Sequence, residues 1–245
     1  LRSRKELATW VSEAAAAELG LANPFVDDQS HLRPTLILGI LDSLKLNQSR
    51  GVAAARLFET GRVFMEVNGT VQECVSVGFI LAHNPKDRAW LARPEPDFYA
   101  VKREIEVLAQ FAGIDLGREG LTPVRGGFWG WQEGQSAAAG DIANGWTARF
   151  GLLNLAMVRA AGIEGKVWGG SLAFLPAKLA GVATRRRYQP FSLFPAALRD
   201  LALVVEAGRH AEDVRTQLVK AAKAATQGAP FTVESVQVFD VYQGK

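Results

Sequence analysis

The chain has 245 residues, of which 48% are hydrophobic and 22% are charged. The hydrophobic fraction is ample for a packed core, and the charged fraction is close to that of an ordinary soluble protein. The formal net charge of +3 comes from 28 basic and 25 acidic residues. So small an excess permits a polyanionic partner but leaves an ordinary, slightly basic protein equally open.

The only cysteine, Cys74, excludes an intramolecular disulfide, which is typical of a reducing compartment. It lies in an alternating run from Val71 to Val77, without a nearby helix start or cationic cluster that would stabilise a thiolate. We therefore expect a buried apolar thiol and not a nucleophile. No apolar run approaches the ~20 residues that span a membrane, and no signal peptide is visible, so the cytoplasm is the expected location.

The first half of the chain alternates between helical and strand-like patterns. Residues 5–19 are rich in alanine and glutamate and predict a helix. Pro34 fits the first turn of a second helix, whose apolar face includes residues from Leu36 to Leu44. A β-rich block follows, and its Asn68-Gly69 pair predicts a tight hairpin turn. We expect strands at residues 56–59, 62–67 and 75–82, with the aromatic side chains of Phe58 and Phe64 in the core.

A third helix is predicted over residues 98–111, after Asp97 as its N-cap. Residues 83–97 contain three prolines and read as a loop, whereas residues 114–150 are rich in glycine and tryptophan. The elements expected next are a strand at 146–150, a helix at 152–161 and a strand at 167–174.

The composition changes at residues 184–187, where three arginines precede Tyr188, and this change predicts a domain boundary. Both ends look like cuts, so we expect the chain to be a piece of a longer polypeptide. The elements predicted beyond the boundary are a strand at 199–205, a helix at 211–225 and a strand at 233–241. This order is half of a split β-α-β plan.

The sequence offers no convincing catalytic or metal centre. The three histidines, His31, His83 and His210, are far apart and lack the spacing of metal ligands. Asp27-Asp28 beside His31 fits a solvated turn better than a metal site. Ser136 is not in a GxSxG elbow, and no P-loop or GxGxxG pattern is present. We expect neither catalytic residues nor bound metal here.

A possible nucleic-acid site lies at the predicted boundary. Arginines can bind phosphates while neighbouring aromatic rings stack on bases. The residues concerned are Arg185, Arg186, Arg187, Tyr188, Phe191 and Phe194. From the residues alone, a solvated linker followed by core aromatics is the better interpretation.

Several blocks, in the same order along nearly the whole chain, resemble the β subunit of bacterial phenylalanyl-tRNA synthetase. The blocks are Leu21–Pro24, Leu32–Leu44, Arg56–Phe64, Asp97–Lys102, Gly134–Ala137, Phe191–Val205 and Phe239–Gly244. The family patterns they match include LRPSLLPGLLDAL, RLFEIGRVF, DFFDLKG, PGQSA and LFDVYRG. One such block is a weak signal, but their common order is specific.

The resemblance implies an α+β fold, with a class II synthetase-like antiparallel sheet flanked by helices and then a partial ferredoxin-like split β-α-β domain. Residues 1–183 would form the non-catalytic synthetase-like core, and residues 184–245 a truncated anticodon-binding domain. The implied partners are a catalytic α subunit, in an αβ heterodimer that pairs into a tetramer, and tRNA(Phe). No membrane or DNA is expected as a partner.

The resemblance also implies which subunit carries out the chemistry. The α subunit would use ATP and Mg²⁺ to activate phenylalanine, so this chain would bind no cofactor itself. Met65 stands where catalytic class II enzymes have a phosphate-binding arginine, and methionine cannot bind phosphate. The residues expected to bind tRNA are Arg185, Arg186, Arg187, Phe191, Phe194 and Arg199. An active class II-type ligase and a stand-alone RNA-binding module remain the alternatives.

Overall fold

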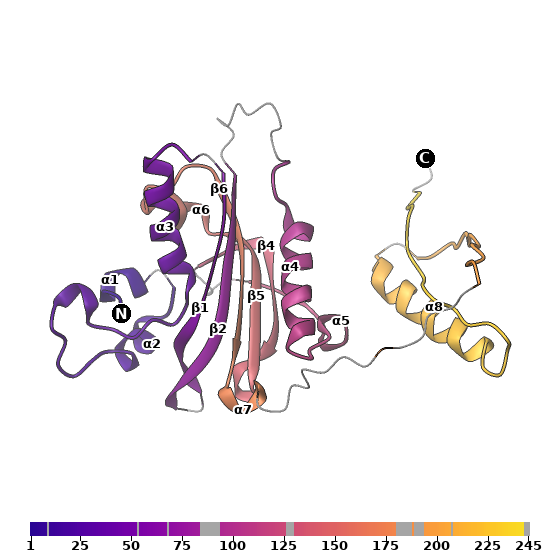
Figure 1. Cartoon of the computed structure of the whole chain (residues 1–245), viewed down its shortest axis with the longest axis horizontal. Helices are drawn as coiled ribbons and strands as arrows, with labels where there is room; N and C mark the ends of the chain where they lie inside the picture. Colours follow the sequence, from indigo (N-terminus) through magenta and orange to yellow (C-terminus); the bar gives the residue numbers. More distant parts are fainter. Residues whose placement is uncertain are drawn as a thin grey trace. The chain divides into compact units, whose positions relative to one another are not determined.

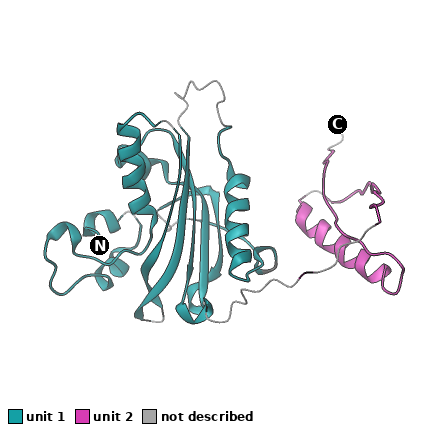
Figure 2. Ribbon diagram, viewed as in Figure 1, with its two compact units in different colours: residues 1–187 teal, residues 188–245 magenta. Residues whose placement is uncertain are grey.

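The computed structural model describes residues 1–8, 10–52, 54–67, 69–83, 94–125, 130–179, 188, 194–206 and 208–242. The chain divides into two compact units, residues 1–187 and residues 188–245 (Figure 2). No helix in the described part has the length and apolar character needed to cross a membrane.

Unit 1 is built on a six-stranded sheet in which every neighbouring pair is antiparallel. The strands are β1 (Ala55–Val67), β2 (Thr70–His83), β3 (Thr122–Pro123), β4 (Trp131–Asp141), β5 (Trp146–Leu153) and β6 (Lys166–Phe174). Their spatial order is β1-β2-β6-β5-β4-β3, so β1 and β3 are the edges. This architecture confirms the predicted α+β class with an antiparallel sheet.

Helices cover both faces of the sheet. The helices of unit 1 are α1 (Arg4–Leu7), α2 (Glu13–Glu18), α3 (Ile37–Ser49), α4 (Phe98–Phe111), α5 (Leu116–Glu119), α6 (Leu155–Ala160) and α7 (Pro176–Leu179). Short 3-10 turns lie at Asp27–Gln29 and Ile142–Asn144. Helices α3 and α6 lie on one side of the sheet, and α4 and α5 lie on the other (Figure 1).

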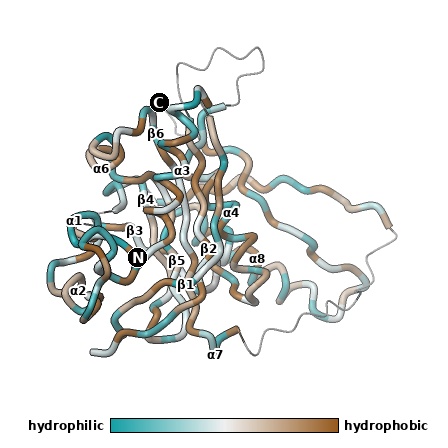
Figure 3. The backbone as a smooth tube through the Cα atoms, turned by 60° about the vertical axis from the view of Figure 1, so that its left-hand side comes forward, coloured by the Kyte–Doolittle hydropathy of each residue, from teal (hydrophilic) through white to brown (hydrophobic). Residues whose placement is uncertain are grey.

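Each face of the sheet therefore has its own apolar core. On the α3 side, Leu36 and Leu44 pack with sheet residues such as Val63 and Val167. The helix comes so close that a Cβ atom on Gly78 would lie 3.1 Å from Cβ of Leu36. The tube in Figure 3 is coloured by hydropathy, and apolar brown stretches recur along the strands between these two layers.

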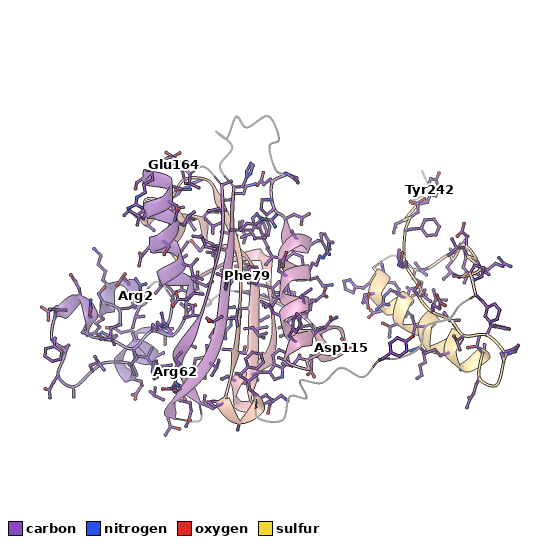
Figure 4. All side chains as sticks on the ribbon, viewed as in Figure 1. Arg2, Arg62, Phe79, Asp115, Glu164 and Tyr242 are labelled. Carbon is purple, nitrogen blue, oxygen red and sulfur yellow. The ribbon has the colours of Figure 1, made fainter. Side chains whose placement is uncertain are left out.

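The α4 side is packed through alternate residues of the strands. Phe150, on β5, is fully buried beneath α4. Val101 and Ile105, on the side of α4 that faces the sheet, are also fully buried. Phe79, labelled in Figure 4, lies between the sheet and α4. Since neighbouring residues of a strand point to opposite faces, the same strands fill both cores.

Helix α4 spans Phe98–Phe111, as the sequence predicts. The Asp97 carboxylate accepts a hydrogen bond from the Ala100 amide at 2.8 Å and so caps the first turn. Strand β6 also begins within a residue of its predicted start. The predicted loop at 83–97 lies mostly outside the described residues.

The predicted hairpin is confirmed, but its first strand is longer than expected. Val67 pairs with Thr70, which leaves a two-residue turn, and Gly69 has φ 79°. The two predicted strands 56–59 and 62–67 form one strand, because Gly61 continues the ladder. A side chain at Gly61 would instead place its Cβ 2.6 Å from the Arg33 guanidinium.

The single helix predicted over residues 5–19 is wrong. Two short helices form there, because two serines act as separate N-caps: Ser3 for α1 and Ser12 for α2. Trp10, between the helices, packs edge-on against Trp131 with the ring centroids 6.2 Å apart. The helix predicted from residue 152 likewise begins only at Leu155, after the strand β5 has ended.

The core assignment of Phe58 is also wrong, since this side chain is 77% exposed on the edge strand β1. Phe64 is partly buried and packs against the small apolar cluster that contains Leu7 and Leu19. Phe58 is exposed because α4 covers its neighbour Phe79, on β2, but does not extend over the outer strand β1. An alternating pattern predicts which face of a strand a residue occupies, but not whether a helix covers that face.

In unit 2, the helix α8 spans Ala211–Ala225, as predicted. The strands predicted at 199–205 and 233–241 are not formed, and their apolar residues, such as Val204 and Phe239, are exposed. A strand is stabilised by a hydrogen-bonded neighbour. In a split β-α-β unit that neighbour is a third strand between the two, and the described residues of unit 2 contain none.

Candidate functional site

Two serine hydroxyl groups that are buried in the sheet, those of Ser76 and Ser136, lie against main-chain carbonyls. Ser76 Oγ donates to the Leu172 carbonyl at 3.1 Å. Ser136 Oγ lies 2.7 Å from the Gln132 carbonyl and 3.0 Å from that of Leu152. It thereby holds the irregular segment of β4 where the pairing register shifts between Trp131 and Ser136. Both serines have structural partners, and neither is hydrogen-bonded to a base among the residues that the structure describes.

Met65 packs, partly buried, against the core on the α3 side of β1. Its thioether can neither carry positive charge nor donate to an anion. Met65 is therefore a packing residue in this structure.

Arg149 is a residue whose environment the sequence analysis missed. It lies on β5 opposite Ser171, and it is the one charged residue of the run from Trp146 to Leu153. Burial lowers the pKa of its guanidinium, and the nearby Asp141 carboxylate acts in the opposite direction. The available signal was a single charged residue inside a strand of apolar neighbours.

Cys74 is fully buried, as predicted. Burial raises the pKa of its thiol, and the charge of Glu73 acts in the same direction. A protonated, buried thiol is a poor nucleophile. In the described part of the chain, no three His, Cys, Asp or Glu side chains gather as a metal site would require.

The structure places only two of the six residues expected to bind tRNA. Phe194 is 83% exposed, as a ring that stacks on a base must be. Arg199 is exposed in the same segment, and its Nη1 donates to the carbonyl of Leu198 at 2.7 Å. The other four, Arg185, Arg186, Arg187 and Phe191, lie outside the described residues.

Unit 2 contains a shallow hollow of about 440 Å³ between the segment that includes Leu203 and the helix α8. Its lining is mainly aliphatic, with Glu206, Arg209 and Gln217 at polar positions. The apolar side of α8 is only half-buried against this segment. This hollow is the incompletely covered interior of unit 2, and it offers no convergent set of catalytic groups.

The geometry therefore defines an α+β protein with two packed cores, a smaller second unit and, among the described residues, no catalytic constellation. Comparison with known proteins identifies the family of this chain. Residues 1–167 match the family model described as "Phenylalanyl tRNA synthetase beta chain CLM domain". The chain belongs to the phenylalanyl-tRNA synthetase β-chain family.

Curated relatives match this chain over all or most of its length, and they belong to the same family. It is 32% identical over 257 residues to the phenylalanine–tRNA ligase β subunit of Novosphingobium aromaticivorans, covering 100% of this chain and 31% of the relative. It is 32% identical to that of Pasteurella multocida, covering 92% of this chain and 27% of the relative. The chain thus spans about a third or less of the curated relatives that it matches.

A solved structure of a pyrrolysyl tRNA synthetase from Desulfitobacterium hafniense aligns with a TM-score of 0.48. The alignment covers 70% of this chain and 56% of that chain at 12% identity. The family assignment rests on the sequence matches.

Proposed function

We propose that this chain is a portion of the phenylalanine–tRNA ligase β subunit that helps to assemble the enzyme and to position tRNA(Phe). The observation that supports this proposal best is the match to the family over residues 1–167, together with 32% identity along the full chain to a curated β subunit. A β subunit implies a partner subunit, here a catalytic α subunit in an αβ heterodimer that pairs into a tetramer.

The division of labour follows from the chemistry of the two chains. The α subunit would use ATP and Mg²⁺ to activate phenylalanine and would transfer it to tRNA. The present chain would contribute its packed sheet to assembly, because Met65 offers no phosphate ligand and the buried serines bind carbonyls. Its place would be the cytoplasm, where translation occurs.

We assign residues 1–183 to a synthetase-like core and residues 184–245 to the beginning of a ferredoxin-like anticodon-binding domain. The exposed Phe194 and Arg199 support a tRNA contact in the second region. The apolar side of helix α8 is only half-covered and leaves room for further packing.

Two variants test the RNA contact: Arg199→Ala, and a triple variant with alanine at Arg185, Arg186 and Arg187. Each lost phosphate contact should weaken binding to tRNA(Phe) and reduce the slope of log K against log salt by about 0.7–0.9. Titrations at several salt concentrations measure both. Arg215→Ala is the matched control, because that exposed arginine is already paired with Glu212. Unchanged affinity and slope in the two test variants would remove the RNA assignment.

Assembly and catalysis are tested separately. The chain should co-purify with a co-expressed α subunit, and loss of co-purification contradicts the assembly role. Alone, the chain should show no phenylalanine-dependent exchange between ATP and pyrophosphate. Measurable exchange would favour an active ligase instead.

A further inference from the structure

The outer edge of β1 has a stretch of main chain without hydrogen-bond partners. Val67 and Thr70 flank a two-residue turn, so they form a hydrogen-bonded pair, and residues at odd positions of β1 point their N–H and C=O groups at β2. The register from Ala55 to Val67 is uninterrupted. Residues at even positions therefore direct both groups away from the sheet.

Arg33 confirms this direction and marks where the exposed edge stops. The Phe64 amide donates to the Arg33 carbonyl at 2.9 Å, and Arg33 Nε donates to the Arg62 carbonyl at 2.9 Å. An ion pair with Glu59, at 2.7 Å, fixes the Arg33 side chain. Arg62, which is labelled in Figure 4, belongs to the part of β1 whose outer edge Arg33 covers.

Before the Arg33 contacts, three consecutive outward positions lie open: Arg56, Phe58 and Thr60; beyond them, Glu66 is a single further outward position next to the hairpin turn. In the part of the chain that the structure describes, no main-chain group of these residues has a hydrogen-bond partner. Proteins generally protect exposed strand edges or pair them with another chain. Such a row of alternating donors and acceptors is matched in spacing by an extended strand.

The side chains beside this edge define the chemistry of the missing strand. Phe58 lies directly opposite Phe79 in the ladder, so both point to the α4 face, but Phe58 is 77% exposed whereas Phe79 is 7% exposed. Arg56 points to the same face, is exposed and has no ion pair among the described residues. Arg62, by contrast, is neutralised by Glu73 on the neighbouring strand.

We propose that residues Arg56–Thr60 form a docking slot to which an extended segment of the partner subunit adds as a seventh strand. The segment carries an apolar residue that covers Phe58 and a carboxylate, two positions away, that pairs with Arg56. A partner with this pattern would form hydrogen bonds with the outward main-chain groups, cover the Phe58 ring and neutralise the charge of Arg56. The inference rests on the proposed assembly and specifies its contact on this subunit.

One substitution removes the main-chain contact selectively. Thr60→Pro deletes an outward N–H group and leaves the ladder to β2 intact, as proline is tolerated on edge strands. Its matched control, Thr60→Val, keeps the N–H group. Phe58→Ser removes the apolar contact, and Phe25→Ser is its control, since Phe25 is fully exposed on a loop. Circular dichroism and thermal unfolding verify that every variant is folded.

The measurements are the affinity of the 245-residue chain for the α subunit and amide hydrogen exchange of the segment 55–61 with and without it. We expect Thr60→Pro and Phe58→Ser each to weaken binding at least tenfold, the controls to stay within twofold, and exchange of the segment to slow in the complex. If the unaltered chain binds but the test variants match their controls and exchange is unchanged, assembly stands and the docking slot is wrong.

A second arm does not depend on the α subunit. The probe is a nine-residue, fluorescently labelled peptide of alternating valine and threonine, with a central leucine and an aspartate two positions away. It should bind the unaltered chain, lose binding with Thr60→Pro, and bind at least fivefold more weakly when lysine replaces the aspartate. No binding to a folded chain, or binding that Thr60→Pro leaves intact, overturns the slot even where α co-purifies. Failure of α to co-purify while the peptide binds overturns the assembly role and the partner subunit as the occupant, but leaves the slot as a strand-binding edge.

Discussion

At the scale of single residues, a network of charges fixes the start of the chain. Glu6 accepts hydrogen bonds from the amide and the hydroxyl of Ser3, both at 2.9 Å, which completes a capping box. Arg2 bridges Glu6 and Asp42 and so ties this segment to α3. Burial alone would raise the pKa of Glu6, but the hydrogen bonds from Ser3 and Arg2 outweigh it, and the pKa is lowered.

This shift predicts a pH-dependent loss of stability. A lowered carboxyl pKa means that the stabilising contribution of Glu6 is complete above the unfolded pKa of about 4.3 and disappears as the pH falls through the folded value. Glu6→Ala should therefore lower the free energy of unfolding at pH 7 by at most about 0.5 kcal/mol, because the carboxylate is 40% exposed and solvent screens its ion pair, and by progressively less below pH ~4. Urea unfolding at several pH values measures this. Glu13→Ala, at a pair that is exposed on both sides, should change little, and equal effects in both variants would contradict the network.

Residue-level prediction succeeded where the local pattern carries the information. An alternating run placed Cys74 in the core, because its neighbours specify the face of the strand. The same pattern misplaced Phe58, since exposure there depends on how far α4 extends over the sheet. Arg149 was missed for a similar reason, because only packing decides whether an arginine in a strand is buried.

At the scale of elements, capping side chains mark where helices begin, both at α4, whose start was predicted, and at α6, which was predicted to begin at residue 152. Helix α4 begins after Asp97 and helix α6 after Asn154, whose side chain accepts from the Ala156 and Met157 amides. A capping side chain stops the preceding segment and satisfies exposed N–H groups of the first turn. Ser12 could have served as the same signal within the predicted helix 5–19.

The cap of α4 provides a direct test. Asp97→Ala should lower the free energy of unfolding by about 1 kcal/mol, because it leaves the Ala100 amide without its acceptor. Asp97→Asn retains an acceptor oxygen and should cost much less. Chemical denaturation of the three proteins gives the comparison. Equal losses for alanine and asparagine would show that the charge, and not the cap, supplies the stability.

At the scale of the whole molecule, unit 1 contains its own cores on both faces of the sheet. The residues that fill them lie between Leu36 and Phe174. Unit 2, in contrast, exposes large apolar residues such as Leu201 and Tyr242. Burial of apolar surface is the main favourable term in folding, so the two units should differ in stability.

This contrast predicts that residues 1–187 fold without the second unit. The shortened chain should retain the far-UV circular dichroism expected for the helices and strands of unit 1. Its thermal midpoint should lie within about 4 °C of that of the full chain, and such a shift corresponds to roughly 1 kcal/mol. Thermal unfolding followed by near-UV signal from the buried tryptophans provides the measurement. A midpoint lower by more than twice that amount would show that unit 1 depends on residues 188–245.

The sequence by itself determined the family, the α+β class, the hairpin at Gly69 and the helices α4 and α8. These features depend on short-range signals: turn residues, caps and periodicity over one or two helical turns. Tertiary structure alone decided that Ala55–Val67 is one strand, that Phe58 is exposed and that the strands expected in unit 2 are unpaired. Each of these outcomes depends on a neighbour distant in the chain, because a strand is completed, or left open, by whatever packs beside it.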